Sequence, residues 1–204
     1  MTRKELEPLK KSTVDKNPIK QFTGWYNKIL QSGTKEPTAM ILATASKDGI
    51  PSVRTVLLKG YDENGFLFFT NYESRKGKEL TENPVAELLF YWMDLQRQVR
   101  ISGKVEKISK QESENYFKTR PLESKIGAWA SKQSEVIPDR EYLEKQFSEY
   151  EKKFKDNVPL PSNWGGFRLI PERFEFWQGR ESRLHDRICY IKKNNVWEIV
   201  RVAP

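Results

Sequence analysis

The 204-residue sequence contains very little cysteine or histidine and no long hydrophobic run. A single cysteine, Cys189, excludes a disulfide within the chain and any metal site built from several cysteines. A single histidine, His185, excludes the metal-binding motifs that need two. The longest apolar stretches, residues 39–45 and 88–93, fall far below the ~18 residues that span a bilayer, and the charged N-terminus has no apolar signal core. We therefore expect a cytoplasmic protein with no metal centre and no membrane segment.

The common nucleotide-binding and hydrolase motifs are also missing. The sequence has no Gly-x-Gly-x-x-Gly, no phosphate loop and no Gly-x-Ser-x-Gly elbow. Any bound molecule must then be held by side chains on strands and at helix starts. No general acid–base pair or nucleophile triad is evident either, which suggests that a bound cofactor supplies the chemistry.

Positive charge is in excess, with 36 Lys and Arg against 28 Asp and Glu and a formal charge of +8. Such a surplus could attract nucleic acid over a broad surface, or its arginines could converge on small phosphorylated molecules. Lys and Arg are distributed along the whole chain, and no RNA-binding aromatic signature is present. We therefore expect no nucleic-acid partner.

The hydrophobic pattern predicts an α+β fold built on an antiparallel barrel with peripheral helices, because successive strands are joined by tight turns without crossover helices. Residues 1–17 are polar and lysine-rich and are predicted to form a flexible basic arm, followed by a single domain over 18–204. Helices are expected at 19–33, 74–82, 109–119, 122–130 and 138–154. Strands are expected at 39–46, 52–59, 66–71, 85–93, 97–108, 167–170, 173–178, 184–193 and 196–202.

Two segments have the donors that a phosphate group requires. Ser74 should cap a helix whose first turn carries Arg75 and Lys76, and free backbone N–H groups beside two cations form an anion site. Tyr116, Arg120 and Ser124 lie four residues apart and offer hydroxyl and guanidinium donors for a second phosphate. Pro121 interrupts that helix, so their alignment is approximate. An ordinary polar helix surface remains the alternative for the second segment.

A third cluster of charge is expected near the C-terminus. On a continuous strand Arg183, His185 and Arg187 would share one face and repel one another unless an anion covered them. A solvated strand face is the alternative. Arg54 and Lys59 would lie on opposite faces of their strand, so they need not bind the same group.

Eight motifs occur in one order and together closely resemble the pyridoxine/pyridoxamine 5′-phosphate oxidase family over about residues 36–204. The motifs are Arg54-Thr-Val-Leu-Leu-Lys59, Ser74-Arg-Lys76, Gln96-Arg-Gln98-Val, Tyr116-Phe-x-x-Arg120-Pro, Ser124-x-Ile-Gly-Ala-Trp129-x-Ser-x-Gln-Ser134, Trp164-Gly-Gly-Phe-Arg, Glu175-Phe-Trp177-Gln-Gly and Arg183-Leu-His-Asp-Arg187. Each motif alone is weak, but eight in register are highly specific.

The resemblance implies an FMN-binding split β-barrel that forms a homodimer, with FMN at the subunit interface. The implied reaction oxidises pyridoxamine or pyridoxine 5′-phosphate to pyridoxal 5′-phosphate, with dioxygen as the electron acceptor. The residues implied to contact FMN are Arg54, Thr55, Val56, Leu57, Leu58, Lys59, Phe69, Thr70, Arg75, Lys76, Gln98, Gln133, Ser134, Trp177 and Arg187. The residues implied to bind substrate are Lys59, Tyr116, Arg120, Ser124, Arg183, Leu184 and His185, of which Arg183 and His185 would be catalytic.

One departure from the family concerns the N-terminus. Some members carry an Arg-x-x-Tyr element that closes over the substrate, and extrapolation from Trp25 places Met1 and Lys4 at those positions. A non-catalytic flavin- or pyridoxal-phosphate-binding protein on the same barrel is the alternative function. Arg183 and His185 favour the oxidase, because a protein that only carries FMN would not need them.

Overall fold

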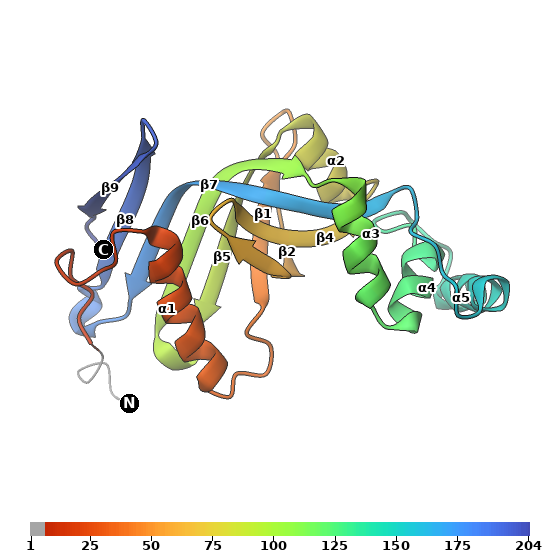
Figure 1. Ribbon diagram of the computed structural model, residues 1–204, viewed down its shortest axis with the longest axis horizontal. Helices are drawn as coiled ribbons and strands as arrows, with labels where there is room; N and C mark the ends of the chain where they lie inside the picture. Colours follow the sequence, from red (N-terminus) through yellow and green to blue (C-terminus); the bar gives the residue numbers. More distant parts are fainter. Residues whose placement is uncertain (1–6) are drawn as a thin grey trace.

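A single curled antiparallel sheet forms the body of the protein in the computed structural model, which describes residues 7–204 (Figure 1). Its strands within this range are β1 Ala39–Ala45, β2 Pro51–Leu57, β3 Gly60–Asp62, β4 Gly65–Asn71, β5 Val85–Trp92, β6 Arg97–Lys107, β7 Trp164–Gln178, β8 Asp186–Lys193 and β9 Val196–Arg201. The order across the sheet is β2-β1-β5-β6-β7-β4-β3, and β8 pairs with both β7 and β9. Every strand pair is antiparallel, so the antiparallel α+β prediction is confirmed.

The long strand β7 joins the two halves of the sheet. One of its edges pairs with β6, while its other edge pairs first with β4 and then with β8. The sequence prediction of two strands, 167–170 and 173–178, is therefore wrong. Pro171, which has no N–H for the ladder, lies between the two predicted strands, but β7 continues through it with a register shift opposite Ser102 and Gly103 of β6.

Five α-helices surround the sheet in the described range: α1 Pro18–Gln31, α2 Arg75–Glu82, α3 Lys110–Thr119, α4 Leu122–Ala130 and α5 Arg140–Phe154. The starts of α1, α2 and α3 follow the capping chemistry of the sequence. Asn17 and Ser74 cap α1 and α2 through their side-chain oxygens, and Ser109 forms a reciprocal capping box with Glu112 at the start of α3. Short 3₁₀ turns at Met93–Leu95 and Glu181–Arg183 were not predicted.

Aromatic side chains fill the core between α1 and the curled sheet. Phe22 on α1 is fully buried, and its ring contacts those of Tyr61, Phe66 and Phe90 at centroid distances of 5.0–5.1 Å. A second, smaller cluster lies beneath α3 and α4, where Phe117 packs against Trp164. This second cluster anchors the helices that border the cavity described below.

Residues 7–17 lie against the β8–β9 hairpin. Leu9 is buried, its N–H donates to the carboxylate of Asp186, and its carbonyl accepts from Arg201. The Tyr190 hydroxyl donates to the carbonyl of Asp15 at 2.6 Å. The part of the predicted arm that is described therefore makes tertiary contacts that its polar composition did not indicate. The rest of that prediction, including Met1 and Lys4, falls on residues 1–6 and lies outside the described residues, and the domain boundary at residue 18 stays a prediction.

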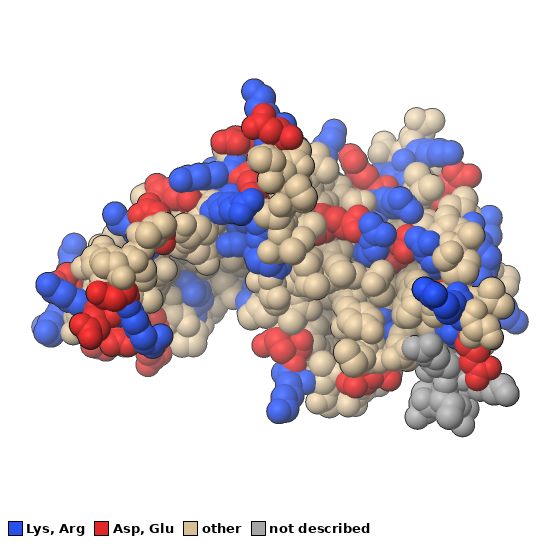
Figure 2. All heavy atoms as spheres, turned by 180° about the vertical axis from the view of Figure 1, so that it is seen from behind, with Lys and Arg blue, Asp and Glu red and all other residues tan. Residues whose placement is uncertain are grey.

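Charge is mixed over the face shown in Figure 2, where Lys and Arg side chains are interspersed with Asp and Glu side chains. Within residues 7–204, no helix combines the length and the apolar character needed to cross a membrane.

Candidate functional site

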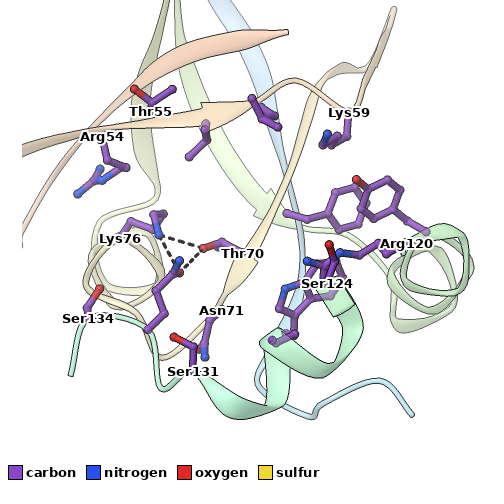
Figure 3. A pocket seen from close by; sticks show the side chains of 18 of the residues that line it. Arg54, Thr55, Lys59, Thr70, Asn71, Lys76, Arg120, Ser124, Ser131 and Ser134 are labelled. Carbon is purple, nitrogen blue, oxygen red and sulfur yellow. Dashed lines mark hydrogen bonds between the residues drawn. The ribbon is translucent and has the colours of Figure 1, made fainter. Parts of the chain in front are cut away.

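A cavity of about 950 Å³ lies between the strands β2 and β4 and the helices α2, α3 and α4. Figure 3 shows Arg54, Lys76 and Ser134 on one side of it and Lys59, Arg120 and Ser124 on the other. The predicted site residues that line it are Arg54, Thr55, Val56, Leu57, Lys59, Phe69, Thr70, Arg75, Lys76, Tyr116, Arg120, Ser124, Gln133 and Ser134. The structure thus brings together side chains that are up to 80 positions apart in the chain.

At one end, the start of α2 presents a buried lysine to the cavity. Lys76 Nζ donates to Thr70 Oγ1 at 3.1 Å and to Gln133 Oε1 at 2.9 Å, which ties α2 to the end of β4 and to the loop after α4. Burial, reinforced by the positive charge of Arg54, lowers the pKa of Lys76 to about 8. Among residues 7–204, Lys76 forms no ion pair closer than 4.0 Å, and a buried ammonium group of this kind attracts an anionic ligand.

Gly77 allows this close approach of α2 to β4. A Cβ at this position would lie 2.2 Å from the carbonyl oxygen of Tyr72 and 2.7 Å from that of Asn71. These atoms belong to the backbone and cannot rotate away, so any larger residue would push the first turn of α2 outward. The positions of Arg75 and Lys76 therefore depend on a glycine in the helix.

Two arginines complete this end of the cavity, which we call the α2 anion site and define as Arg54, Arg75 and Lys76. Arg54 comes from β2 and its side chain is 19% exposed, whereas the side chain of Arg75 on α2 is 60% exposed. Both arginines bind the buried carboxylate of Glu79. Sequence reasoning missed Glu79, although its spacing of four residues from Arg75 is typical of a helical ion pair.

At the other end, Tyr116, Arg120 and Ser124 come from α3, the α3–α4 junction and α4. The predicted interruption at Pro121 is confirmed, because Arg120 has an extended backbone and α4 begins at Leu122. All three side chains still line the same cavity. Arg120 Nη1 is buried and has no hydrogen-bond partner within the described residues. Burial lowers the pKa of Arg120, as expected for a cation that lacks a counter-charge.

Stacked aromatic rings support Arg120. The rings of Phe69 and Tyr116 are 3.9 Å apart and nearly parallel, and the ring of Trp164 stacks on Phe69 at 5.4 Å. The guanidinium of Arg120 lies over Trp164 at 4.7 Å. The rings fix the guanidinium in place without neutralising it, because an aromatic face attracts a cation but carries no net charge.

A second group of predicted site residues lies outside the cavity. Gln98, Trp177 and Arg187 are cross-strand neighbours and form a row across β6, β7 and β8. The ring of His185 packs on Trp177 at 4.7 Å. We call Gln98, Trp177, His185 and Arg187 the β8 row. Figure 1 shows β8 and β9 at the opposite end of the protein from α4 and α5.

The predicted cationic strand face at residues 183–187 is wrong. Arg183 lies in a 3₁₀ turn with φ of +61°, and β8 starts only at Asp186. The side chains of Arg183, His185 and Arg187 therefore do not alternate along one strand. Arg187 instead forms a bidentate ion pair with the buried Glu175, at 2.9 and 3.1 Å.

Two leucines of the predicted set have contrasting environments. Leu58 is buried in the main core and does not line the cavity. Leu184 is 71% exposed and lies beside His185 in a shallow pocket formed with residues 201–204. Arg183, also a predicted site residue, directly precedes Leu184 at the end of the 3₁₀ turn Glu181–Arg183.

The residues present fit two phosphorylated molecules in one cavity. The α2 anion site and Arg120 provide guanidinium and ammonium donors at two separate ends of the cavity. Arg120 Nη1, which has no partner within the described residues, can donate a hydrogen bond to a ligand. The volume suits a cofactor together with a small substrate. Within the described residues, no three His, Cys, Asp or Glu side chains form a group that could hold a metal ion.

Family models match most of the chain. One described as pyridoxamine 5′-phosphate oxidase matches residues 27–154, and one described as the pyridoxine 5′-phosphate oxidase C-terminal dimerisation region matches residues 164–204. A relative from Trichormus variabilis named pyridoxine/pyridoxamine 5′-phosphate oxidase is 54% identical over 98% of this chain and 94% of its own. A relative of the same name from Coxiella burnetii is 54% identical over 92% of this chain and 96% of its own.

Solved structures share the fold. PhzG from Burkholderia lata 383, in complex with tetrahydrophenazine-1-carboxylic acid, is 31% identical with a TM-score of 0.92, covering 98% of this chain and 99% of its own. A pyridoxamine 5′-phosphate oxidase-related, FMN-binding protein from Nostoc punctiforme is 18% identical with a TM-score of 0.74, covering 94% of this chain and 100% of its own. The predicted split-barrel fold is confirmed by these similarities.

Proposed function

The chain belongs to the pyridoxamine 5′-phosphate oxidase family, and on this basis we propose that it is an FMN-dependent oxidase acting on pyridoxamine 5′-phosphate and pyridoxine 5′-phosphate. The alcohol loses two hydrogens to give pyridoxal 5′-phosphate, and dioxygen takes them up as hydrogen peroxide. The amine gives the same aldehyde after water releases ammonia. The observation that supports this proposal most directly is a cavity with separate phosphate-type donors at its two ends.

The α2 anion site would hold the phosphate of FMN. Lys76 is already buried and hydrogen-bonded to Thr70 and Gln133, so its ammonium is fixed before the ligand arrives. A preformed set of charged donors binds phosphate with little ordering cost. Gln133 and Ser134, on the loop after α4, close the same end of the cavity.

The second end would hold the phosphate of the substrate. Arg120, Tyr116 and Ser124 supply three donors there, and Lys59 lines the same end of the cavity (Figure 3). When bound, FMN would accept a hydride from the substrate carbon and return the electrons to dioxygen. The chain's own contribution is to fix the distance and angle between the two rings through their phosphate groups.

We propose that a homodimer completes the site. The β8 row lies away from the cavity of its own chain, and three of its four members, Trp177, His185 and Arg187, fall within residues 164–204, which match a C-terminal dimerisation region. In a dimer, the β8 row of one chain, with Arg183 and Leu184, would cover the cavity of the other. Arg183 would then orient the substrate ring, and His185 would hydrogen-bond its polar groups. The cytoplasmic location stays a prediction.

Purified protein tests the oxidase directly. We expect flavin absorbance, release of FMN on denaturation, and equimolar oxygen consumption and peroxide formation with either phosphorylated substrate. Pyridoxamine without its phosphate is the matched control, and it should react far more slowly because Arg120 then has no partner. Protein that cannot be reconstituted with FMN refutes the proposal. Protein that binds FMN but oxidises neither substrate is the alternative, a flavin-binding protein of the same fold.

A further inference from the structure

Glu79 is the acidic side chain at the base of the α2 anion site. It lies in the second turn of α2, and its side chain is only 7% exposed. Oε2 accepts hydrogen bonds from the hydroxyls of Thr44 and Ser52, each at 2.5 Å, and both come from the strands beside α2. Hydrogen bonds from these hydroxyls and from Arg75, together with the charge of Arg54, outweigh the effect of burial and lower the pKa of Glu79 to about 2. The carboxylate is therefore ionised at neutral pH.

The carboxylate and the two hydroxyls fix the guanidinium of Arg54. Arg54 Nη2 donates to Glu79 Oε2 at 3.2 Å and to Ser52 Oγ at 2.5 Å. Arg54 Nη1 donates to Thr44 Oγ1 at 2.5 Å and to the carbonyl of Leu42 at 3.2 Å. Its Nε is the donor that none of these contacts uses. Nη1 also donates to the carbonyl of Ser52 at 3.4 Å, so five acceptors on β1, β2 and α2 hold one rotamer of Arg54.

The other oxygen of the carboxylate orients Arg75. Arg75 Nε donates to Glu79 Oε1 at 2.9 Å, and this contact leaves its two terminal nitrogens unused. Arg75 lines the cavity and is 60% exposed, so without Glu79 its long side chain would be free to leave the site. Holding an arginine through Nε presents its terminal fork to a phosphate as a pair of parallel donors.

Glu79 also sets the charge around Lys76. The charged groups that face Lys76 are Arg54 from β2 and Glu79 from its own helix, while Gln133 from the loop after α4 is neutral. The negative charge of Glu79 opposes the effect of Arg54 and of burial, and so keeps Lys76 more protonated. A single carboxylate therefore acts on all three cations of the α2 anion site.

We propose that Glu79 is a positioning residue for the cofactor phosphate, holding Arg54 and Arg75 in their binding rotamers without touching the ligand itself. This inference rests on the proposed function, because it assigns the phosphate of FMN to the α2 anion site. A carboxylate that merely neutralised the three cations would have the opposite effect, since it would repel a phosphate.

Titration of the apoprotein with FMN separates these two roles. The Kd is measured from the quenching of flavin fluorescence as FMN binds. Glu79→Ala should raise the Kd for FMN roughly 3- to 10-fold, which corresponds to the cost of ordering one arginine side chain at binding. Glu79→Gln keeps a single acceptor oxygen, which can serve either the two hydroxyls or Arg75 but not both, and its Kd should lie between those of the Ala variant and the parent. Glu82→Gln, an exposed glutamate on the same helix, is the matched control and should leave Kd unchanged.

Two readouts exclude a merely structural effect. In an Arg75→Ala background the effect of Glu79→Ala should shrink, because the arginine that it positions is absent. In Glu79→Gln, FMN binding should also weaken at a lower pH than in the parent, because Lys76 loses its proton earlier. The gentler Gln variant keeps this second test open if the Ala variant fails to fold.

Three results would overturn the inference: tighter FMN binding by both Glu79 variants, the same fold-change for Glu79→Ala with and without Arg75, or an unshifted pH profile in Glu79→Gln. Failure of the proposed function is distinguishable, because the parent protein itself would then not bind FMN.

Discussion

Raising the pH should weaken FMN binding, because it deprotonates Lys76. The pKa of this side chain lies at about 8 in the unliganded protein because it is buried beside Arg54. Since that pKa is lowered, the lysine is charged below pH 8 and becomes neutral as the pH rises through 8. The phosphate of FMN remains a dianion throughout this range, because its second pKa is ~6. Affinity should therefore be full near pH 7 and should fall above pH 8.

The magnitude follows from the fraction of protein that is competent to bind. With a pKa of about 8, roughly one lysine in eleven is still protonated at pH 9. If the charged form alone binds well, the apparent Kd at pH 9 is about ten times that at pH 7. The bound phosphate raises the pKa of Lys76 in the complex, so the decline continues beyond pH 9.

The assay is a fluorescence titration of apoprotein with FMN at intervals between pH 6.5 and 9.5. Lys76→Met is the test variant, and it should bind FMN weakly at pH 7 and show no further decline up to pH 9. Lys78→Met removes an exposed lysine from the same helix and should behave like the parent. A parent curve that stays flat between pH 7 and 9, or a decline that persists in Lys76→Met, would refute the role of Lys76.

Three further predictions concern other parts of the molecule. Arg120→Met should raise the KM for pyridoxamine 5′-phosphate roughly 10- to 100-fold, as expected for a lost charged hydrogen bond, while the affinity for FMN stays unchanged. The Tm of the apoprotein should rise, because the variant removes a buried unpaired charge. Arg183→Ala should lower turnover with FMN retained, whereas Arg187→Ala should weaken FMN retention, and the reverse pattern in flavin content and peroxide assays would show that the two roles are exchanged. Gly77→Ala should cost about 1–3 kcal/mol of stability, measured by denaturant unfolding, because its Cβ meets the carbonyl of Tyr72; an unchanged midpoint would contradict this packing.

The local features of the fold could be predicted because they depend on short-range chemistry. Ser74, and Ser109 with Glu112, start their helices as the sequence indicates, and Pro121 separates α3 from α4. Features that depend on distant partners were missed. β7 continues through Pro171 with a register shift in its ladder to β6, and the hydrophobic pattern of residues 164–178 does not reveal that shift.

The candidate site divides in the same way. The helix start alone predicted that Arg75 and Lys76 belong to one site, and both line the cavity, whereas their binding to a phosphate stays a prediction. The geometry of residues 183–187 could not be predicted from the sequence. Strand periodicity assumes an extended backbone, whereas Arg183 has a positive φ. Glu79 was not predicted as a site residue, because its environment depends on hydrogen bonds from Thr44 and Ser52 on neighbouring strands.

The separation of the β8 row from the cavity has a consequence for mixed populations of subunits. In the proposed homodimer, a chain carrying Arg75→Ala keeps an intact β8 row, and a chain carrying Arg187→Ala keeps an intact cavity. A hybrid of the two would have one site with both defects and one site with neither. Random reassociation of equal amounts of the two variants should therefore give about a quarter of all sites without either defect, so that two alleles that are each impaired alone would sustain activity together.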